Sequence, residues 1–297
     1  MTGRAANAVN QTISERGAET PPDVSRRTFV GIGAAAAVLP GIPGEQKGGA
    51  GPAGRVYAIL GDIHANIEAL RAVLDDARAQ GATHYACVGD VVGYNAAPRE
   101  CVHVVRDELK CPVVRGDHDH YVSHPDENLA DQDPDAARTV EWTRRQLADE
   151  DVRWLRDLPL SERVMNFMLV HATLDMPDRW CGVFDDQQAE VNFIFQYMQF
   201  CFHGHTHVPL IYANTPGGVA RRKPRDFTYE FGQKLFINVG SVGQPRDGDP
   251  RASYVLFDLA ARQIRFRRLE YDVAAAQARI REASLPDRYA KRLEQGR

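Results

Sequence analysis

Seven aspartate and histidine side chains stand in five short sequence blocks that could together hold metal ions. The seven are Asp62, His64, Asp90, Asp117, His171, His205 and His207. Carboxylates and imidazoles in this mixture suit borderline first-row cations such as Mn, Fe, Zn, Co or Ni. Because seven ligands exceed what a single catalytic zinc needs, we expect two divalent cations to share them and to leave positions open for water and substrate.

Two of the blocks carry their ligands at alternate positions. Residues 62–64 read Asp-Ile-His and residues 205–207 read His-Thr-His. In an extended segment alternate side chains point the same way, so we expect both ligands of each block to reach one ion. Glycines beside the ligands allow tight turns and a close backbone approach to an ion or a phosphate. These glycines are Gly61, Gly89, Gly116 and Gly204.

The elements ahead of the first three blocks alternate between strand and helix. Short apolar runs predict strands at residues 55–60, 84–88 and 112–115, and helices are expected after Asn66 and from Pro98 to about residue 109. This order indicates a parallel sheet with crossover helices. Ligands of open α/β sheets lie beyond the carboxyl ends of the strands, so we expect the blocks to converge on one site.

The second half of the chain continues with elements of both kinds. Helices are expected over residues 135–158 and 187–199 and in the charged last 25 residues, and strands over residues 165–170, 200–202, 235–239, 253–259 and 263–269. No internal repeat is evident. The sequence thus predicts one mixed α/β domain over residues 55–297.

Residues 1–54 differ in composition from the rest. Arg26 and Arg27 precede a weakly apolar run and then a stretch rich in glycine and proline, which resembles a twin-arginine export signal. The apolar part, residues 29–42, is shorter than the roughly 20 residues that a transmembrane helix needs. We therefore expect export to the periplasm or cell surface and no transmembrane helix. The alternative is a disordered tail on a cytoplasmic protein.

Composition and charge exclude some classes of protein. The net charge of −4 comes from balanced, scattered charges, so no nucleic-acid-binding or membrane-binding surface is indicated. An anionic substrate must then be recognised locally. The five cysteines are odd in number and form no CxxC pair, which argues against a disulfide framework and a zinc knuckle.

Taken in order, the blocks resemble the calcineurin-like metallophosphoesterases. The resemblance runs from about Arg55 to the C-terminus, and residues 238–254 are similar to a bacterial and archaeal phosphodiesterase-like subgroup. It implies a four-layer α/β/β/α sandwich with mixed sheets. It also implies hydrolysis of a small-molecule or nucleotide phosphoester, with a diester somewhat favoured over a monoester. The natural substrate and the oligomeric state are not readable from the sequence.

The resemblance also implies how the ligands divide between two cations. One cation takes Asp62, His64 and His207, the other takes Asp117, His171 and His205, and Asp90 bridges both. The family mechanism is attack on phosphorus by a metal-bridging hydroxide at this dinuclear site. By the same resemblance, His118 stabilises the developing charge or protonates the leaving oxygen, and Asp119 orients His118.

A polar, glycine-rich loop follows the predicted strand at 235–239. Its Asn238, Ser241 and Arg246 are candidates for the wall of the substrate pocket, with Arg246 meeting phosphate. The alternative is that these residues provide turn chemistry that supports the sheet. The sequence does not decide between the two.

Asp117 departs from the family pattern. The family block reads Gly-Asn-His-Asp, whereas this chain has an aspartate in place of the asparagine. A carboxylate still ligates, but its extra charge opposes an anionic substrate, so we expect lower activity or a shifted metal preference. Two alternatives stay open. One is a weakly active or inactive metal-binding scaffold that binds a nucleotide or a protein partner; the other is a single-metal hydrolase.

Overall fold

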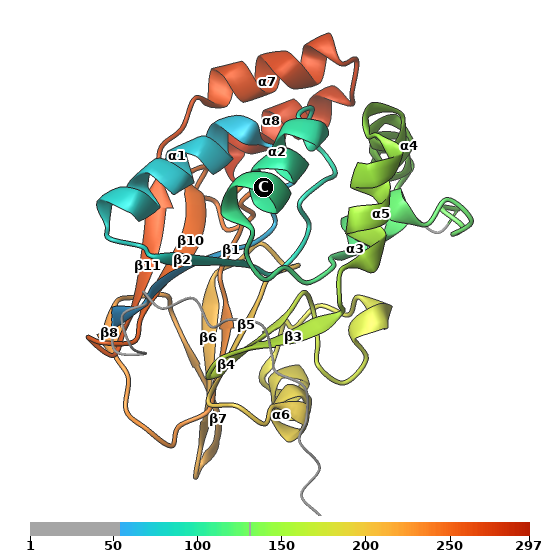
Figure 1. Ribbon diagram of the computed structural model, residues 1–297. Helices are drawn as coiled ribbons and strands as arrows, with labels where there is room; N and C mark the ends of the chain where they lie inside the picture. The colour runs from blue at the N-terminus through green and yellow to red at the C-terminus, as the bar shows by residue number, and fades with distance from the viewer. Residues whose placement is uncertain (1–53, 131) are drawn as a thin grey trace, which may run out of the picture. The chain divides into compact units, whose positions relative to one another are not determined.

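Two β-sheets lie face to face in the part of the chain that the structure describes, which is residues 54–130 and 132–297 of a computed structural model (Figure 1). The first sheet has five strands in the order β2-β1-β10-β11-β8, and the second has six in the order β3-β4-β5-β9-β6-β7. The predicted export-like segment lies, apart from Gly54, outside the described residues, so export stays a prediction. Within the described ranges, no helix is both long and apolar enough to cross a membrane.

Both sheets are mixed, as predicted. In the first, β1 runs parallel to β2 and antiparallel to β10. In the second, β4, β5 and β9 are parallel neighbours, and β3 and β6 join antiparallel. The strands are β1 (Val56–Leu60), β2 (His84–Cys87), β3 (Ser161–Val164), β4 (Phe167–Val170), β5 (Phe200–His203), β6 (Leu210–Thr215), β7 (Gly218–Arg222), β8 (Phe227–Thr228), β9 (Leu235–Asn238), β10 (Ala252–Asp258) and β11 (Gln263–Leu269).

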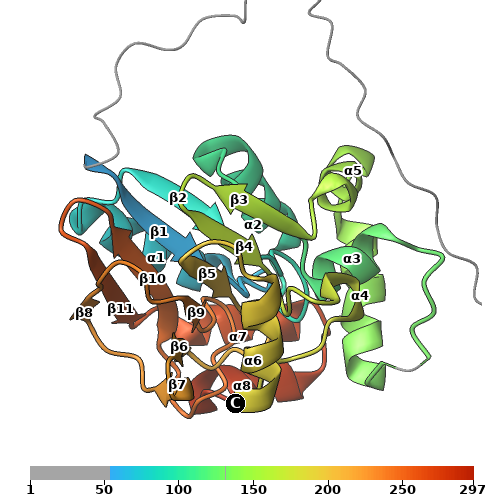
Figure 2. The ribbon, with the colours of Figure 1, turned by 90° about the horizontal axis from the view of Figure 1, so that it is seen from below.

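Helices cover the outer face of each sheet. Helices α3, α4 and α5 lie together at one side, and Figure 2 shows them apart from α6. The helices are α1 (Ile67–Ala79), α2 (Pro98–His103) with its π-helical continuation η2 (Val104–Leu109), α3 (Asp117–Ser123), α4 (Pro134–Gln146), α5 (Asp149–Asp157), the 3₁₀ turn η3 (Pro177–Arg179), α6 (Asp186–Phe195), α7 (Val273–Glu282) and α8 (Asp287–Gln295).

Three apolar layers separate these four layers of structure. Between the sheets, Ile59 of β1 meets aromatic and aliphatic side chains of β5 and β9. The next residue, Leu60, points the opposite way and packs under α1. On the far side, Phe236 of β9 packs against Phe193 of α6. Strand side chains alternate between faces, so each sheet buries both faces. The four-layer α/β/β/α architecture is confirmed.

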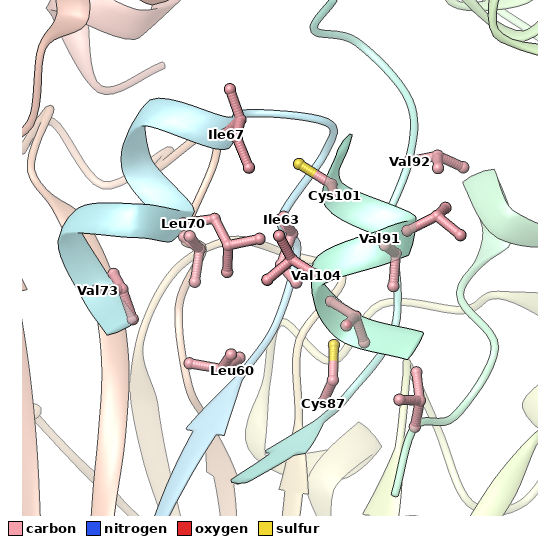
Figure 3. Close-up of a cluster of buried hydrophobic side chains, with 14 of the residues drawn as sticks. Leu60, Ile63, Ile67, Leu70, Val73, Cys87, Val91, Val92, Cys101 and Val104 are labelled. Carbon is pink, nitrogen blue, oxygen red and sulfur yellow. The ribbon is translucent and has the colours of Figure 1, made fainter. Parts of the chain in front are cut away.

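Helix α1 holds the loop of the first ligand block in place. Asn66 caps it as predicted, accepting a hydrogen bond from the backbone N–H of Ala69. Its apolar face, including Leu70 and Val73, is buried against β1 and the α2 segment (Figure 3). Burial of each such side chain contributes about 1.5–3 kcal/mol, so the start of α1 is firmly anchored.

Two parts of the predicted topology are wrong. Residues 112–115 form only one bridge, between Cys87 and Val113, because Pro112 has no N–H to extend a ladder. No strand leads up to Asp117, which is instead the first residue of α3. The ligand blocks also do not follow one parallel sheet: β1 and β2 belong to the first sheet, whereas β4 and β5 belong to the second.

Candidate metal centre

The structure brings all seven predicted ligands to one place, where the ends of strands from both sheets meet. Their donor atoms form two groups, each with every donor within 4.8 Å of the others. We call them the first and the second ligand group. The first consists of Asp62, His64, Asp90 and His207; the second consists of Asp117, His171 and His205.

Asp90 connects the two groups. Its Oδ2 atom lies 3.4 Å from Nε2 of His64, in the first group. The same oxygen lies 3.4 Å from Nε2 of His171, in the second group. Its other oxygen, Oδ1, accepts a hydrogen bond from the backbone N–H of His118, which fixes the carboxylate. One carboxylate is thus shared, as the division of ligands between two ions requires.

The histidine rings are oriented so that their lone pairs face the centre. The Nδ1 atoms of His64, His171 and His207 lie 3.1, 2.8 and 2.6 Å from backbone carbonyl oxygens. A carbonyl only accepts hydrogen bonds, so Nδ1 carries the proton and Nε2 is free to bind a cation. This tautomer lets the three rings ligate through Nε2, whereas His205 presents Nδ1 to the site, 3.0 Å from Oδ1 of Asp117.

Two further observations test whether the residues fit a divalent cation. The Nε2 atoms of His64 and His207 are 3.0 Å apart, the separation of two nitrogens each about 2.1 Å from one ion at roughly a right angle. Oδ2 of Asp62 is buried and has no hydrogen-bond partner among the described residues. An unpartnered buried carboxylate oxygen is costly unless a cation compensates it. The donor set therefore fits a divalent metal.

The backbone reaches this arrangement through left-handed turns. Asp62 and His64 have φ of 50° and 47°, and His205 and His207 have φ of 66° and 60°. The prediction that these blocks are extended is therefore wrong, because left-handed residues at alternate positions, and not a strand, set the directions of the side chains. The prediction that both ligands of a block reach one ion is also wrong for His205 and His207, which fall in different ligand groups. Non-glycine residues rarely adopt this conformation, and such strain concentrates at functional sites.

Burial and charge act differently on the two groups. In the first, burial raises the pKa of Asp62 to about 7 and lowers that of His64 to about 3. In the second, burial alone would lower the pKa of His171, but Asp90 and Asp117 raise it well above its usual value. Burial would likewise raise the pKa of Asp117, but His205 and His171 hold this pKa well below its usual value. The imidazoles of the first group thus stay neutral. In the absence of a cation the carboxylates favour a protonated His171, and a bound cation would take the place of its Nε2 proton.

His118 lies beside both groups. Its ring is 6% exposed, and its Nε2 is 3.9 Å from Oδ2 of Asp117. Tyr94 packs on the ring with centroids 4.2 Å apart, and a Cβ at Gly93 would come within 2.5 Å of Nδ1. Gly93 and Tyr94 therefore position this ring.

Asp119 does not make the predicted contact with His118. Its Oδ1 accepts from the backbone N–H of Val92, and its Oδ2 accepts from that of Gly116. The carboxylate is thus committed to capping α3 and to holding the loop after β2. That loop carries Tyr94, so Asp119 supports the position of His118 only indirectly.

The candidate substrate residues are placed unequally. Asn238 donates to the carbonyl of Gly204 and to Oγ1 of Thr206, and it accepts from the N–H of Gly240. Ser241 donates to the carbonyl of Asp62 and accepts from the N–H of Gln244. Both side chains are buried and support the turns that present the ligands, as in the turn-chemistry alternative.

Arg246, the third candidate, lines a cavity of about 250 Å³ together with Asp90, Asp117, His118, His205 and His207. Its guanidinium lies 5.3 Å from the ring centroid of Tyr94 and donates to Oε1 of Gln244. This places a cation where a phosphate can meet it.

Three further residues line this cavity and were missed from the sequence. They are Tyr94, Phe184 and Thr206. Thr206 stands between two predicted ligands, which was a usable signal. Tyr94 follows a glycine shortly after the second block, in a left-handed conformation with φ of 55°. Phe184 belongs to a loop without a pattern.

Comparison with known proteins agrees with this geometry. The sequence model of the calcineurin-like phosphoesterase superfamily domain matches residues 56–262. The chain belongs to this superfamily. An uncharacterised protein of Methanocaldococcus jannaschii is 37% identical over 246 residues, which cover 82% of this chain and 98% of that protein.

Solved structures show the same superfamily fold. A metallophosphoesterase from Sphaerobacter thermophilus is 37% identical, with a TM-score of 0.71 over 82% of this chain and 99% of the other. A hypothetical protein from Pyrococcus horikoshii has a TM-score of 0.68 at 22% identity, over 82% and 98% of the two chains. The second likeness is evidence for the fold alone.

Proposed function

We propose that this calcineurin-like phosphoesterase hydrolyses phosphoester bonds with two divalent cations. The observation that carries the proposal is the pair of ligand groups joined through one oxygen of Asp90. Asp62, His64 and His207 would hold one cation, and Asp117, His171 and His205 the other. Bound there, the cations would act as Lewis acids on phosphoryl oxygens and lower the pKa of water.

The protein's own side chains have separate tasks in this reaction. Arg246 binds and orients the phosphoryl group through its guanidinium. Among the described residues that line the cavity, it is the only arginine or lysine. His118 donates a proton from Nε2 to the leaving oxygen. Its position suits this role, because it lies beside Asp117 and lines the same cavity. Asn238 and Ser241 hold the ligand-bearing turns.

A phosphodiester is the favoured substrate class. The support is the similarity of residues 238–254 to a phosphodiesterase-like subgroup, together with the local charge of the cavity. Asp117 adds a third carboxylate to the site, and a diester carries less negative charge than a monoester. The added repulsion is therefore smaller for a diester.

One observation favours the second candidate, a metal-binding scaffold with little or no turnover. Oδ1 of Asp117 lies 3.0 Å from both Nε2 of His171 and Nδ1 of His205. That carboxylate neutralises positive charge at the point where an anionic substrate must bind. The scaffold would bind a nucleotide or a protein partner through the same cavity.

A metal-reconstituted screen against phosphomonoesters, phosphodiesters and nucleotides separates the two candidates. We expect hydrolysis in the presence of Mn, Fe, Zn, Co or Ni. The variant His118→Asn should lose about 10²–10⁴-fold in rate while its metal content is preserved, since His118 transfers a proton and does not hold a cation. Turnover that is absent in every reconstitution would support the scaffold. Turnover that is unchanged in His118→Asn would show that His118 is not the proton donor.

A further inference from the structure

A second cavity opens beside the metal centre. It has a volume of about 290 Å³ and shares two lining residues, Phe184 and Thr206, with the cavity that contains the ligands. Thr206 lies between His205 and His207 in the chain, so the side cavity begins one residue from each ion ligand. A group attached to a phosphoryl at the metal centre can therefore extend directly into it.

The lining of the side cavity is mainly apolar. Val183, Val208, Leu210 and the ring of Tyr212 form most of its wall. The one guanidinium of the lining, that of Arg221, is already paired with Asp186, with Nε 3.1 Å from Oδ1. No unpaired charge among the lining residues is left to attract an ionic group, so the cavity suits a neutral one.

Phe184 forms an aromatic side of this cavity. Its ring is 66% exposed although its backbone is fixed, since its N–H donates to Oε1 of Gln188 at the start of α6. The ring lies over Gly182, where a Cβ would come within 2.4 Å of Cε2. A glycine at that point lets the ring lie flat along the loop. A ring held in this way, with an open face between two cavities, is a stacking surface.

Tyr212 provides a second, independent sign of a ligand. The residue is fully buried at the wall of the cavity, yet its hydroxyl has no hydrogen-bond partner among the described residues. Leaving a buried hydroxyl unpaired is costly, and a bound polar group relieves that cost. The volume is near the lower end for small-molecule pockets, which fits a single ring system.

We infer that the side cavity binds a neutral aromatic ring carried by the phosphoester, with one face of the ring against Phe184 and a polar ring edge toward Tyr212. The inference rests on the proposed function, because the phosphoryl group of the same molecule occupies the metal centre. The substrate class is thus an aryl or heteroaryl phosphoester, and simple alkyl phosphoesters are poor substrates.

Two non-hydrolysable probes isolate the contribution of the ring. Benzylphosphonate and methylphosphonate present the same anionic head group and differ in the ring. We expect calorimetric titration of the metal-reconstituted full chain to show benzylphosphonate binding about tenfold more tightly, the order expected for burying and stacking one ring. Equal affinities would overturn the inference.

Three variants locate the ring. Phe184→Ala should reduce the preference to about twofold or less, since it removes the stacking face. Val208→Phe, which fills the cavity, should weaken benzylphosphonate and leave methylphosphonate unchanged. Phe231→Ala is the matched control, because Phe231 is also largely exposed, at 77% against 66% for Phe184, but lines a different cavity. A preference that survives both cavity variants, or falls equally in the control, contradicts the assignment.

The titration tests the side cavity separately from the hydrolysis screen that tests the proposed function. The titration measures binding and needs no turnover. A ring preference without hydrolysis in the screen would reject the enzyme and keep the side cavity as a ligand site. Hydrolysis without a ring preference would reject the side cavity alone.

Discussion

The two ligand groups differ in how firmly the fold holds them. In the first group, the side chains of His64 and Asp62 are fully buried, and those of Asp90 and His207 are each 2% exposed. In the second, Asp117 is 15% and His205 21% exposed. His171 of the second group is only 1% exposed, and both groups contribute residues to the cavity lining. Asp117 and His205 are thus the two ligands most open to solvent, whereas every ligand of the first group is almost fully buried.

The backbone ties residues of both groups to neighbouring blocks, since the N–H of His205 in the second group donates to Oδ1 of Asp62. His64 of the first group is tied to the next block through its N–H, which donates to the carbonyl of Asp90. Asp117 of the second group stands at the first turn of the seven-residue helix α3. From the difference in exposure of the ligands, we predict that an ion in the first group is retained tightly and that an ion in the second group exchanges more readily.

Removal of the shared ligand should have the largest effect. Asp90→Ala takes a carboxylate from both groups, so we expect weaker binding of both ions. The loss of several kcal/mol of charge stabilisation corresponds to about a thousandfold or more in rate. Elemental analysis and phosphoester assays measure the two effects. The control is Asp178→Ala, an exposed aspartate. If Asp90→Ala retains both ions, Asp90 is not shared.

Single removals from each group sharpen the contrast. His205→Ala should release one equivalent of metal and keep the other, because the first group is untouched. His64→Ala should cost more stability, since it leaves a cavity in the buried first group and weakens the cation that would compensate buried Asp90 and Asp62. Metal content and thermal unfolding of the two variants, measured side by side, test this. Equal losses in both would show that the groups are equivalent.

The charge at position 117 should have the smallest effect on rate. Asp117→Asn keeps an oxygen ligand and removes a negative charge that opposes an anionic substrate. We expect turnover under metal saturation to rise several-fold. Asp117→Ala, which removes the ligand itself, is the contrasting variant and should lower it. An unchanged or lower rate in Asp117→Asn would mean that the carboxylate is not a handicap.

The types and order of the ligands were predictable, but their geometry was not. Asp62 and His64 were identified because residue types that bind divalent cations directly follow a predicted strand. Their left-handed backbone was not, since local sequence gives little sign of φ at non-glycine positions. The split of the blocks over two sheets depends on β10 entering beside β1, a pairing of residues far apart in the chain.

Side-chain partners escaped prediction for a similar reason. Asp119 looked like a partner of the neighbouring His118, but its carboxylate caps α3 and binds the N–H of Val92. Phe184 comes from a loop whose path is set by the packing of α6 on the second sheet. Contacts of this kind become visible only once the tertiary structure is known.

The most direct test of the central claim is the metal content of the reconstituted protein. The two joined ligand groups predict two equivalents of divalent metal per chain at saturation. Brief chelation should remove the ion of the exposed second group first, leaving one equivalent and abolishing hydrolysis. A fully active protein that contains one equivalent of metal would contradict the dinuclear centre.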